Sequence, residues 1–254
     1  MRRSLCSVGI ENWSADRISL QQYTMPSFTE ENVRAHFEKL ALSYDDGKTK
    51  NSTYYTHLKK NLQLRIPHGR SVLEIGCGTG DILQSLSPSR GVGIDISQVM
   101  IKQCKQKYPQ GTWFHGNMAE FLQSNNDTYD FILLADTVEH VPNLPALFSQ
   151  LPHVSHLGTQ LIISMANPLW ELLLLLLEAL HLKMPEGPHR RLRSTILLSA
   201  LQQEGFEPSG RSFHLLLPTY IPLLSSIATA CERVPLLRRC GVIEILRLEY
   251  VGKK

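Results

Sequence analysis

The chain has 254 residues and a formal net charge of +3, with 43% hydrophobic and 19% charged residues. This composition is that of an ordinary globular protein, long enough to bury the core of one α/β domain. Its dense basic spots lack interleaved aromatic residues, which argues against nucleic-acid binding. The five cysteines fall at no metal-ligand spacing, so we predict no metal site and expect a reduced, cytoplasmic chain.

The amino-terminal region predicts an arm followed by two helices. Residues 1–28 are of mixed polar composition, which predicts a flexible arm and no signal peptide. Apolar residues at helical spacing predict a helix from Ser27 or Thr29 to about Tyr44, ended by Asp45-Asp46-Gly47. A second helix, 52–64, stops before Pro67. These helices, within 29–66, form the predicted cap of a single domain covering 29–254.

The segment SVLEIGCGTG, residues 71–80, predicts a buried strand followed by a tight turn into a helix over about 80–87. Glycines at 76, 78 and 80 tolerate a positive φ and allow a ligand to approach the backbone. A second strand, 91–95, ends in Asp95 about 20 residues after the turn, the separation at which an acidic residue meets ribose hydroxyls. The sequence therefore predicts a nucleoside-binding βαβ unit.

The spacing E-x-G-x-G-x-G, read from Glu74 to Gly80, resembles motif I of the class I S-adenosylmethionine-dependent methyltransferases. A dinucleotide site, with its different glycine spacing, is the alternative. The resemblance implies S-adenosylmethionine as cofactor and a Rossmann-like seven-stranded sheet of order 3-2-1-4-5-7-6 with strand 7 antiparallel. The cofactor contacts it implies include Glu74, Gly76, Cys77, Gly78, Gly80, Asp95, Ile96, Ala135 and, from the leading helices, Tyr44.

Two further cofactor contacts are expected after the third strand. Ser97 is the predicted N-cap of a helix that ends before Pro109, and residues 112–115 read as the third strand. In the resembled family, an acidic residue that meets the adenine often stands at the position of Asn117. An asparagine can still accept from the adenine amine, with Met118 beside it. The alternative is that Asn117 only caps a helix.

The fourth strand, 129–134, leads into the candidate catalytic residues Asp136, Glu139 and His140. Open α/β sheets bind ligands beyond the carboxyl ends of their strands, so this segment should face the methyl group of the cofactor. An imidazole exchanges protons near neutral pH, which makes His140 the candidate base for a hydroxyl acceptor. A helix-start histidine bonded to backbone is the alternative. The segment is also similar to one in ubiquinone-pathway O-methyltransferases, where such residues can help to hold a divalent ion.

The remaining elements continue the alternation of strands and helices. We expect a helix over about 143–153, a strand over 159–165, a helix over 194–204 capped by Ser194, and final strands over 206–217 and 242–251. Gly205 is expected to end the helix 194–204 as the glycine at its C′ position. This alternation predicts a doubly wound α/β sheet with helices on both faces.

Two apolar insertions, 167–193 and 215–237, do not belong to the bare fold. The first contains six consecutive leucines, yet its apolar stretch is too short to span a bilayer. We expect the insertions to form a roof over an acceptor pocket, flanked by Arg190 and Arg191. Ordinary core packing and a peripheral membrane contact are the alternatives. The segments Asn167-Pro168-Leu169-Trp170 and Lys183-Met184-Pro185, with the later Leu-Leu-Pro-x-Tyr-Ile-Pro-Leu-Leu segment, resemble bacterial methyltransferases found beside, or fused to, glycosyltransferases.

Together these features predict a methyltransferase that acts on a small or lipid-like, partly apolar acceptor in a biosynthetic pathway. A hydroxyl oxygen is the expected nucleophile, with N- or C-methylation as alternatives. A non-catalytic binding subunit with the same fold is a further alternative. We expect a monomer or a homodimer that does not bind nucleic acid.

Overall fold

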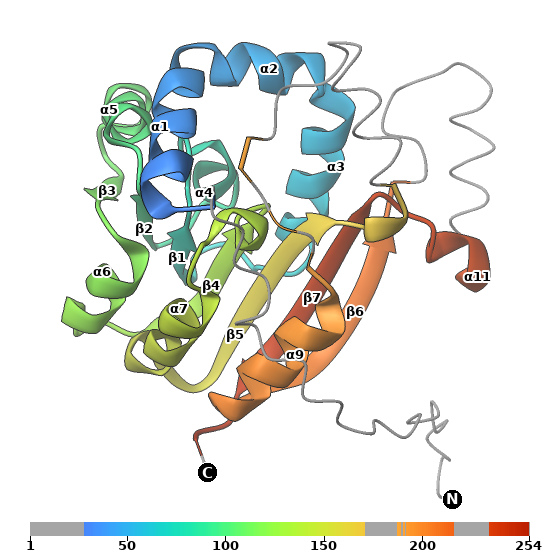
Figure 1. Cartoon of the computed structure of the whole chain (residues 1–254). Coiled ribbons are helices and arrows are strands. Elements are labelled where there is room, and N and C mark those ends of the chain that lie inside the picture. The colour runs from blue at the N-terminus through green and yellow to red at the C-terminus, as the bar shows by residue number, and fades with distance from the viewer. Residues whose placement is uncertain (1–27, 171–186, 189, 191, 216–233, 254) are drawn as a thin grey trace, which may run out of the picture.

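The computed structural model describes residues 28–170, 187–188, 190, 192–215 and 234–253 (Figure 1). Its centre is a seven-stranded sheet of order β3-β2-β1-β4-β5-β7-β6. Strand β7 pairs antiparallel with both β5 and β6, and the other pairs are parallel. The predicted strand order and the antiparallel strand 7 are confirmed. The strands are β1 Ser71–Ile75, β2 Arg90–Asp95, β3 Thr112–His115, β4 Tyr129–Ala135, β5 Ser155–Ala166, β6 Phe206–His214 and β7 Ile243–Tyr250.

Helices cover both faces of the sheet, as the alternation predicts. On one face, α3 (Ser52–Gln63), α4 (Asp81–Ser85) and α5 (Gln98–Lys107) pack on the strands. On the other face lie α6 (Met118–Ser124), α7 (Leu144–Gln150) and α9 (Ser194–Gln203). The two buried layers share strands β1, β4, β5 and β7, whose successive side chains point to opposite faces. The sheet is therefore the middle layer of three.

Helices α1 (Glu30–Leu40) and α2 (Tyr44–Lys50) precede α3 and lie near the carboxyl ends of β1 and β2 (Figure 1). Thr29 caps α1 by accepting a hydrogen bond from the backbone N–H of Asn32, as predicted. The predicted end of this helix at residues 44–47 is wrong. A 3-10 turn over Ala41–Ser43 leads directly into α2, because acidic residues in its first turn and lysines in its last complement the helix dipole.

Three other boundaries differ from the sequence predictions. Arg193, and not Ser194, occupies the N-cap position of α9, and no side chain caps that helix. Strand β5 begins at Ser155, four residues early, because Thr159 donates to the carbonyl of Tyr129 and keeps the bulged start paired with β4. Strand β6 ends at His214, whereas the sequence predicts that it continues to 217.

Most of the two insertions lies outside the described residues, as does the arm 1–27. The roof that the insertions are expected to form over an acceptor pocket therefore stays a prediction, as does the place of Arg191 beside it. At the end of the second insertion, α11 (Pro235–Arg238) leads into β7. No helix among the described residues is both long and apolar enough to cross a membrane.

Candidate functional site

The turn after β1 is closely packed and needs its glycines. Gly76, Gly78 and Gly80 have φ values of +76°, +52° and +82°, which favour glycine. A Cβ on Gly76 would lie 2.4 Å from the side chain of Thr137, and one on Gly80 would lie 2.6 Å from the ring of Trp113. The turn is thus held against the segment after β4 on one side and against β3 on the other.

Asp95 is buried at the end of β2 and is oriented by this turn. Its two oxygens accept hydrogen bonds from the backbone N–H of Gly78, at 2.9 Å, and of Ser97, at 2.8 Å. Burial raises the pKa of Asp95, although these two N–H groups act in the opposite direction. A buried carboxylate that accepts only two bonds from the described residues keeps acceptor capacity for a ligand diol. Asp95 and the glycine turn therefore fit the ribose and backbone contacts that a nucleoside cofactor needs.

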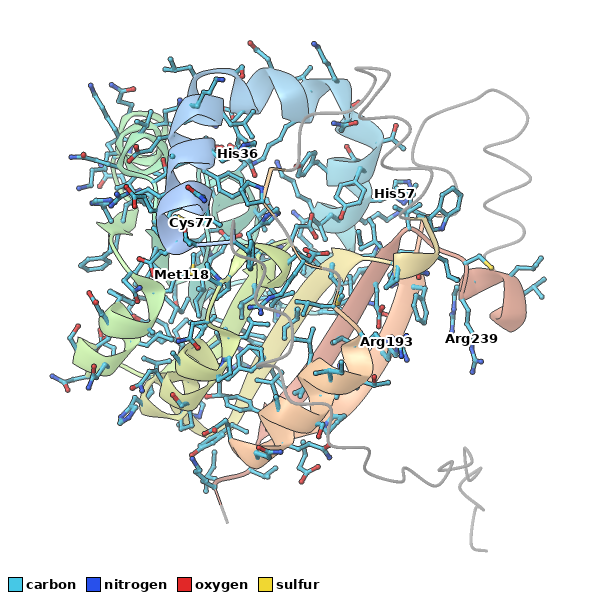
Figure 2. All side chains as sticks on the ribbon, in the orientation of Figure 1. His36, His57, Cys77, Met118, Arg193 and Arg239 are labelled. Carbon is cyan, nitrogen blue, oxygen red and sulfur yellow. The ribbon has the colours of Figure 1, made fainter. Side chains whose placement is uncertain are left out.

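Glu74 and Cys77 lie on the core side of the turn. The carboxyl group of Glu74 accepts from the backbone N–H of Leu83, at 3.1 Å, and its burial raises its pKa to about 8. The sulfur of Cys77 packs against β2. A Cβ added to Gly93 of that strand would lie only 2.9 Å from it. In Figure 2, Cys77 is labelled at this turn. Both side chains support the turn, and a cofactor contact of either residue stays a prediction.

Asn117 caps α6. Its Oδ1 accepts from the backbone N–H of Ala119 and Glu120, and its Nδ2 donates to Glu30 of α1 at 2.6 Å. Met118, labelled in Figure 2, packs partly buried against the core. The capping alternative therefore holds, and the adenine contacts of both residues stay predictions. Nearby, His115 donates through Nε2 to the carbonyl of Ile96, at 3.1 Å.

Tyr44 covers the glycine turn from α2. A Cβ on Gly78 would lie 3.2 Å from its ring. Burial raises the pKa of Tyr44 well above its ordinary value, so the phenol keeps its proton and can donate. This position agrees with the predicted approach of Tyr44 to the cofactor, which stays a prediction.

Asp136 follows β4 in a left-handed conformation, with φ +51°. Its Oδ1 accepts from the hydroxyl of Ser164 on β5, at 2.7 Å, and its Oδ2 accepts from the phenol of Tyr54 on α3, at 2.9 Å. Burial, and next the nearby charge of Asp136, raise the pKa of Tyr54, so the phenol remains a donor. Such strain in a non-glycine residue is typical of functional sites. The backbone of Ala135, the preceding residue, accepts from the hydroxyl of Thr137.

Glu139 and His140 lie in the 3-10 turn Val138–His140 and contact different partners. The carboxylate of Glu139 accepts from the backbone N–H of Ala166, at 3.0 Å. Nδ1 of His140 lies 3.0 Å from the carbonyl oxygen of Pro188, and since that oxygen only accepts, Nδ1 carries the proton. The ring of His140 also meets Phe37 of α1 edge-on, with centroids 5.1 Å apart.

The structure thus brings Asp136 and His140 to the same edge of the sheet as the glycine turn and Asp95. It does not gather Asp136, Glu139 and His140 around one point. Among the described residues, no three His, Cys, Asp or Glu side chains are placed to hold a metal ion together.

A family model described as a methyltransferase domain matches residues 48–209, more than half of the chain. The chain belongs to this methyltransferase family. Its fold is that of the class I S-adenosylmethionine-dependent members, and its cofactor is S-adenosylmethionine, as the motif I resemblance implied.

Solved structures share the fold of this methyltransferase. One is a methyltransferase from Thermotoga maritima, with a TM-score of 0.65 and 17% identity, covering 86% of this chain and 99% of that one. Another is the N-methyltransferase NodS from Bradyrhizobium japonicum, in complex with S-adenosylhomocysteine. Its TM-score is 0.59 at 15% identity, over 86% of this chain and 98% of that one. At these identities the likeness shows the fold alone.

Among curated proteins, the demethylmenaquinone methyltransferase of Bacillus licheniformis is 30% identical over 145 residues. The match covers 52% of this methyltransferase and 62% of that relative. The Bacillus subtilis protein of the same name is 26% identical over 152 residues, which are 54% of this chain and 64% of that one. The chain thus spans less than two thirds of the length of these relatives.

Several residues that shape this edge of the methyltransferase are not apparent from the sequence alone. Nothing in the local sequence singles out Tyr54, because its partner Asp136 lies on a distant segment of the chain. Ser164 lies within an apolar strand, and only its pairing with Asp136 reveals its role. Arg190, expected to flank an opening, is instead buried, and its guanidinium donates to the carbonyls of Val141 and Pro142. That expectation is wrong for Arg190.

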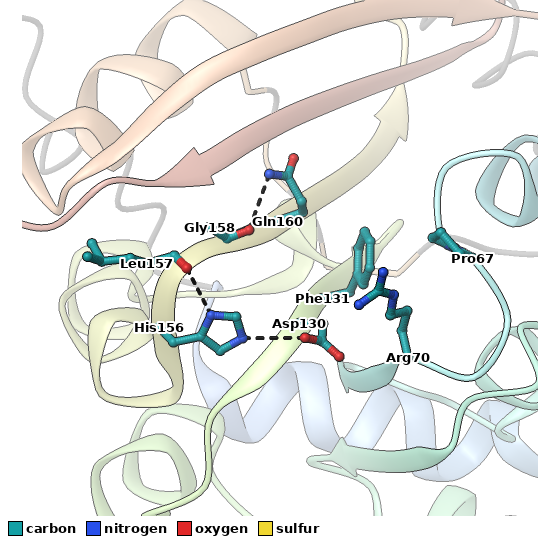
Figure 3. Close-up of a pocket in the computed structure, with 8 residues that line it drawn as sticks. All are labelled: Pro67, Arg70, Asp130, Phe131, His156, Leu157, Gly158 and Gln160. Atoms are coloured by element: carbon teal, nitrogen blue, oxygen red, sulfur yellow. Dashed lines mark hydrogen bonds and ion pairs between the residues drawn. The ribbon is translucent and has the colours of Figure 1, made fainter.

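A separate pocket of about 280 Å³ lies at the opposite edge of the sheet, where β1 and β4 begin (Figure 3). There Asp130 accepts from the backbone N–H and the hydroxyl of Ser71, both at 2.9 Å, and ties β4 to β1. These bonds lower the pKa of Asp130. Because it lies away from the glycine turn, this pocket is not part of the cofactor site. Its lining residues are Pro67, Arg70, Asp130, Phe131, His156, Leu157, Gly158 and Gln160.

Asp81 should make the methyltransferase less stable in acid. Burial alone would raise its pKa, but hydrogen bonds from Lys107 and Tyr108 and the charge of Lys48 outweigh burial and lower it to about 2. The stabilisation is therefore present above the ordinary pKa of 3.8 and is lost as the pH falls toward 2. Asp81→Asn should lower the free energy of unfolding by about 1–2 kcal/mol at pH 7.

Urea unfolding at pH 7 and at several values down to pH 2 measures this effect. The difference between wild type and variant should shrink as the pH falls, while Asp46→Asn, at an exposed position of α2, serves as the control. A difference that stays constant over this range would show that the ion pairs of Asp81 do not stabilise the fold.

Proposed function

We propose that this chain transfers the methyl group of S-adenosylmethionine to a small, partly apolar acceptor, with a hydroxyl oxygen as the nucleophile, in a biosynthetic pathway. The observation that carries the proposal is that the candidate cofactor-binding and catalytic residues lie at the same edge of the sheet. The glycine turn and the buried Asp95 lie at the ends of β1 and β2, and Asp136 and His140 follow the neighbouring β4.

The residues at this edge have distinct proposed roles. Asp95 binds the ribose through the acceptor capacity of its buried oxygens, and Gly78 lets the cofactor approach the backbone. S-adenosylmethionine supplies an electrophilic methyl group on a sulfonium sulfur. His140 takes the proton of the acceptor hydroxyl at Nε2, because Nδ1–H donates to Pro188 and fixes the tautomer. Asp136, held by Tyr54 and Ser164, keeps a fixed negative charge beside the transfer site.

A second candidate acceptor comes from the relatives. The similar Bacillus proteins are named for demethylmenaquinone, which makes an acceptor of that kind, methylated at another atom, the alternative. An apolar acceptor of either type agrees with the leucine-rich insertion. Contact of that insertion with a membrane surface would be one way to reach such an acceptor.

The test combines cofactor binding with a transfer assay. Calorimetry should detect binding of S-adenosylhomocysteine and no binding of NAD, since the glycine spacing is not that of a dinucleotide site. Label from methyl-labelled S-adenosylmethionine should then move to a member of a panel of apolar hydroxyl compounds, with demethylmenaquinone tested beside the panel as the alternative acceptor. Cofactor binding without transfer to any acceptor would favour the non-catalytic subunit, and absence of binding would overturn the proposal.

A further inference from the structure

A lysine with a largely buried side chain lies against the glycine turn. Lys48, on α2, has a side chain that is only 10% exposed, and its Nζ lies 3.4 Å from the hydroxyl of Thr79. The same nitrogen lies 4.5 Å from the centre of the Tyr44 ring, which itself covers Gly78. Lys48 therefore places a cation beside Thr79 and against the aromatic ring that covers Gly78.

Two lysines pair with Asp81, and Lys48 makes the longer of the two contacts. Lys107 donates to Asp45 at 2.8 Å and to Asp81 at 2.6 Å. Lys48 approaches Asp81 only to 3.6 Å. Burial lowers the pKa of Lys48, although the charges of Asp81, Glu74 and Asp45 act against it. A buried ammonium group with so long an ion pair is stabilised when a carboxylate comes closer.

The position of Lys48 relative to the strands indicates which ligand group would come close. Strand β1 lies between β2, which ends in Asp95, and β4, which leads to Asp136 and His140. If the cofactor binds with its ribose at Asp95 and its methyl group toward His140, its sulfur would lie over the turn after β1, between the two. The amino-acid tail, which bears a carboxylate, is attached to that sulfur. Among the described residues, Lys48 is the lysine whose largely buried side chain contacts this turn.

We propose that Lys48 binds the carboxylate of the amino-acid tail of S-adenosylmethionine and so selects ligands that carry this tail. The inference rests on the proposed ribose contact of Asp95. On binding, Lys48 exchanges its long contact with Asp81 for a charge-assisted hydrogen bond to the carboxylate. Asp81 keeps two partners, since Lys107 and the phenol of Tyr108 still donate to it.

Two ligands that differ in the tail test this role. S-adenosylhomocysteine carries the tail, whereas 5′-methylthioadenosine has the same adenosine and sulfur without it. In calorimetry, Lys48→Met should weaken binding of S-adenosylhomocysteine at least about tenfold and binding of 5′-methylthioadenosine less than about twofold. Lys48→Arg, which keeps the charge, should restore most of the lost affinity. Lys50→Met, at an exposed position of the same helix, is the matched control.

Each outcome decides between the two proposals. If the wild type binds neither ligand, the proposed function and this inference both fail. If the wild type binds S-adenosylhomocysteine but Lys48→Met weakens both ligands equally, or neither, Lys48 has only a structural role. Thermal unfolding of each variant shows that it is folded. Should Lys48→Met not fold, Lys48→Gln replaces it, and the ratio of the two affinities remains the deciding quantity.

Discussion

Asp95→Ala should bind S-adenosylhomocysteine at least about tenfold more weakly than the wild type, because two charge-assisted hydrogen bonds to the ribose, each worth about 1.5–3 kcal/mol, are lost. The structure adds a second effect. The carboxylate also accepts from the backbone N–H of Gly78 and Ser97, so its removal leaves two N–H groups of the site without their acceptor. We therefore expect a lower melting temperature together with the weaker binding.

Asp95→Asn separates these two effects. The amide keeps one acceptor oxygen for the backbone, but it loses the negative charge and half of the acceptor capacity. Calorimetry on both variants, with melting temperatures measured beside it, should rank affinity as wild type, then Asn, then Ala. Asp127→Ala, at an exposed position before β4, is the control. Unchanged affinity in a folded Asp95→Ala protein would refute the ribose contact.

The sequence predicted this part of the fold well because the relevant signals are local. The apolar run before Gly76 predicted the first buried strand, and the alternation of strands and helices predicted a doubly wound sheet. The strand order itself came from the resemblance to the class I methyltransferases. The caps at Thr29 and Ser97 also lie where expected, since a capping side chain bonds to a backbone N–H within its own helix. Such contacts depend on a few neighbouring residues, so they can be read from the sequence.

The residues that the sequence did not identify depend on contacts between distant segments. Tyr54 and Asp136 are 82 positions apart, and only the packing of α3 across the end of β4 makes them partners. Lys48 was missed for a different reason. The run Asp45-Asp46-Gly47 has the composition of a turn, yet the chain continues as α2 because its charges complement the helix dipole and Asp45 accepts from Thr79 at 2.7 Å.

His140→Gln should lower kcat by about 10²–10⁴ with a hydroxyl acceptor, while affinity for S-adenosylhomocysteine stays unchanged. The expected loss follows from the orientation of the ring. Because Nδ1–H donates to the carbonyl of Pro188, the lone pair of the neutral imidazole is on Nε2, the atom that would take the proton. Glutamine can preserve the bond to Pro188 through its amide N–H, but it cannot accept a proton at neutral pH.

This split between kcat and cofactor affinity distinguishes a catalytic His140 from a structural one. Loss of the contacts with Phe37 and Pro188 alone would lower stability and disturb cofactor binding along with turnover, because Phe37 belongs to the helix that leads into α2. His153→Gln, at an exposed position before β5 on the opposite edge of the sheet, should leave both quantities unchanged. If His140→Gln reduces kcat by less than about threefold, the proton goes to another group or the acceptor atom carries none. An acceptor atom without a proton would favour methylation at an atom other than a hydroxyl oxygen. Demethylmenaquinone would then be the first acceptor to test.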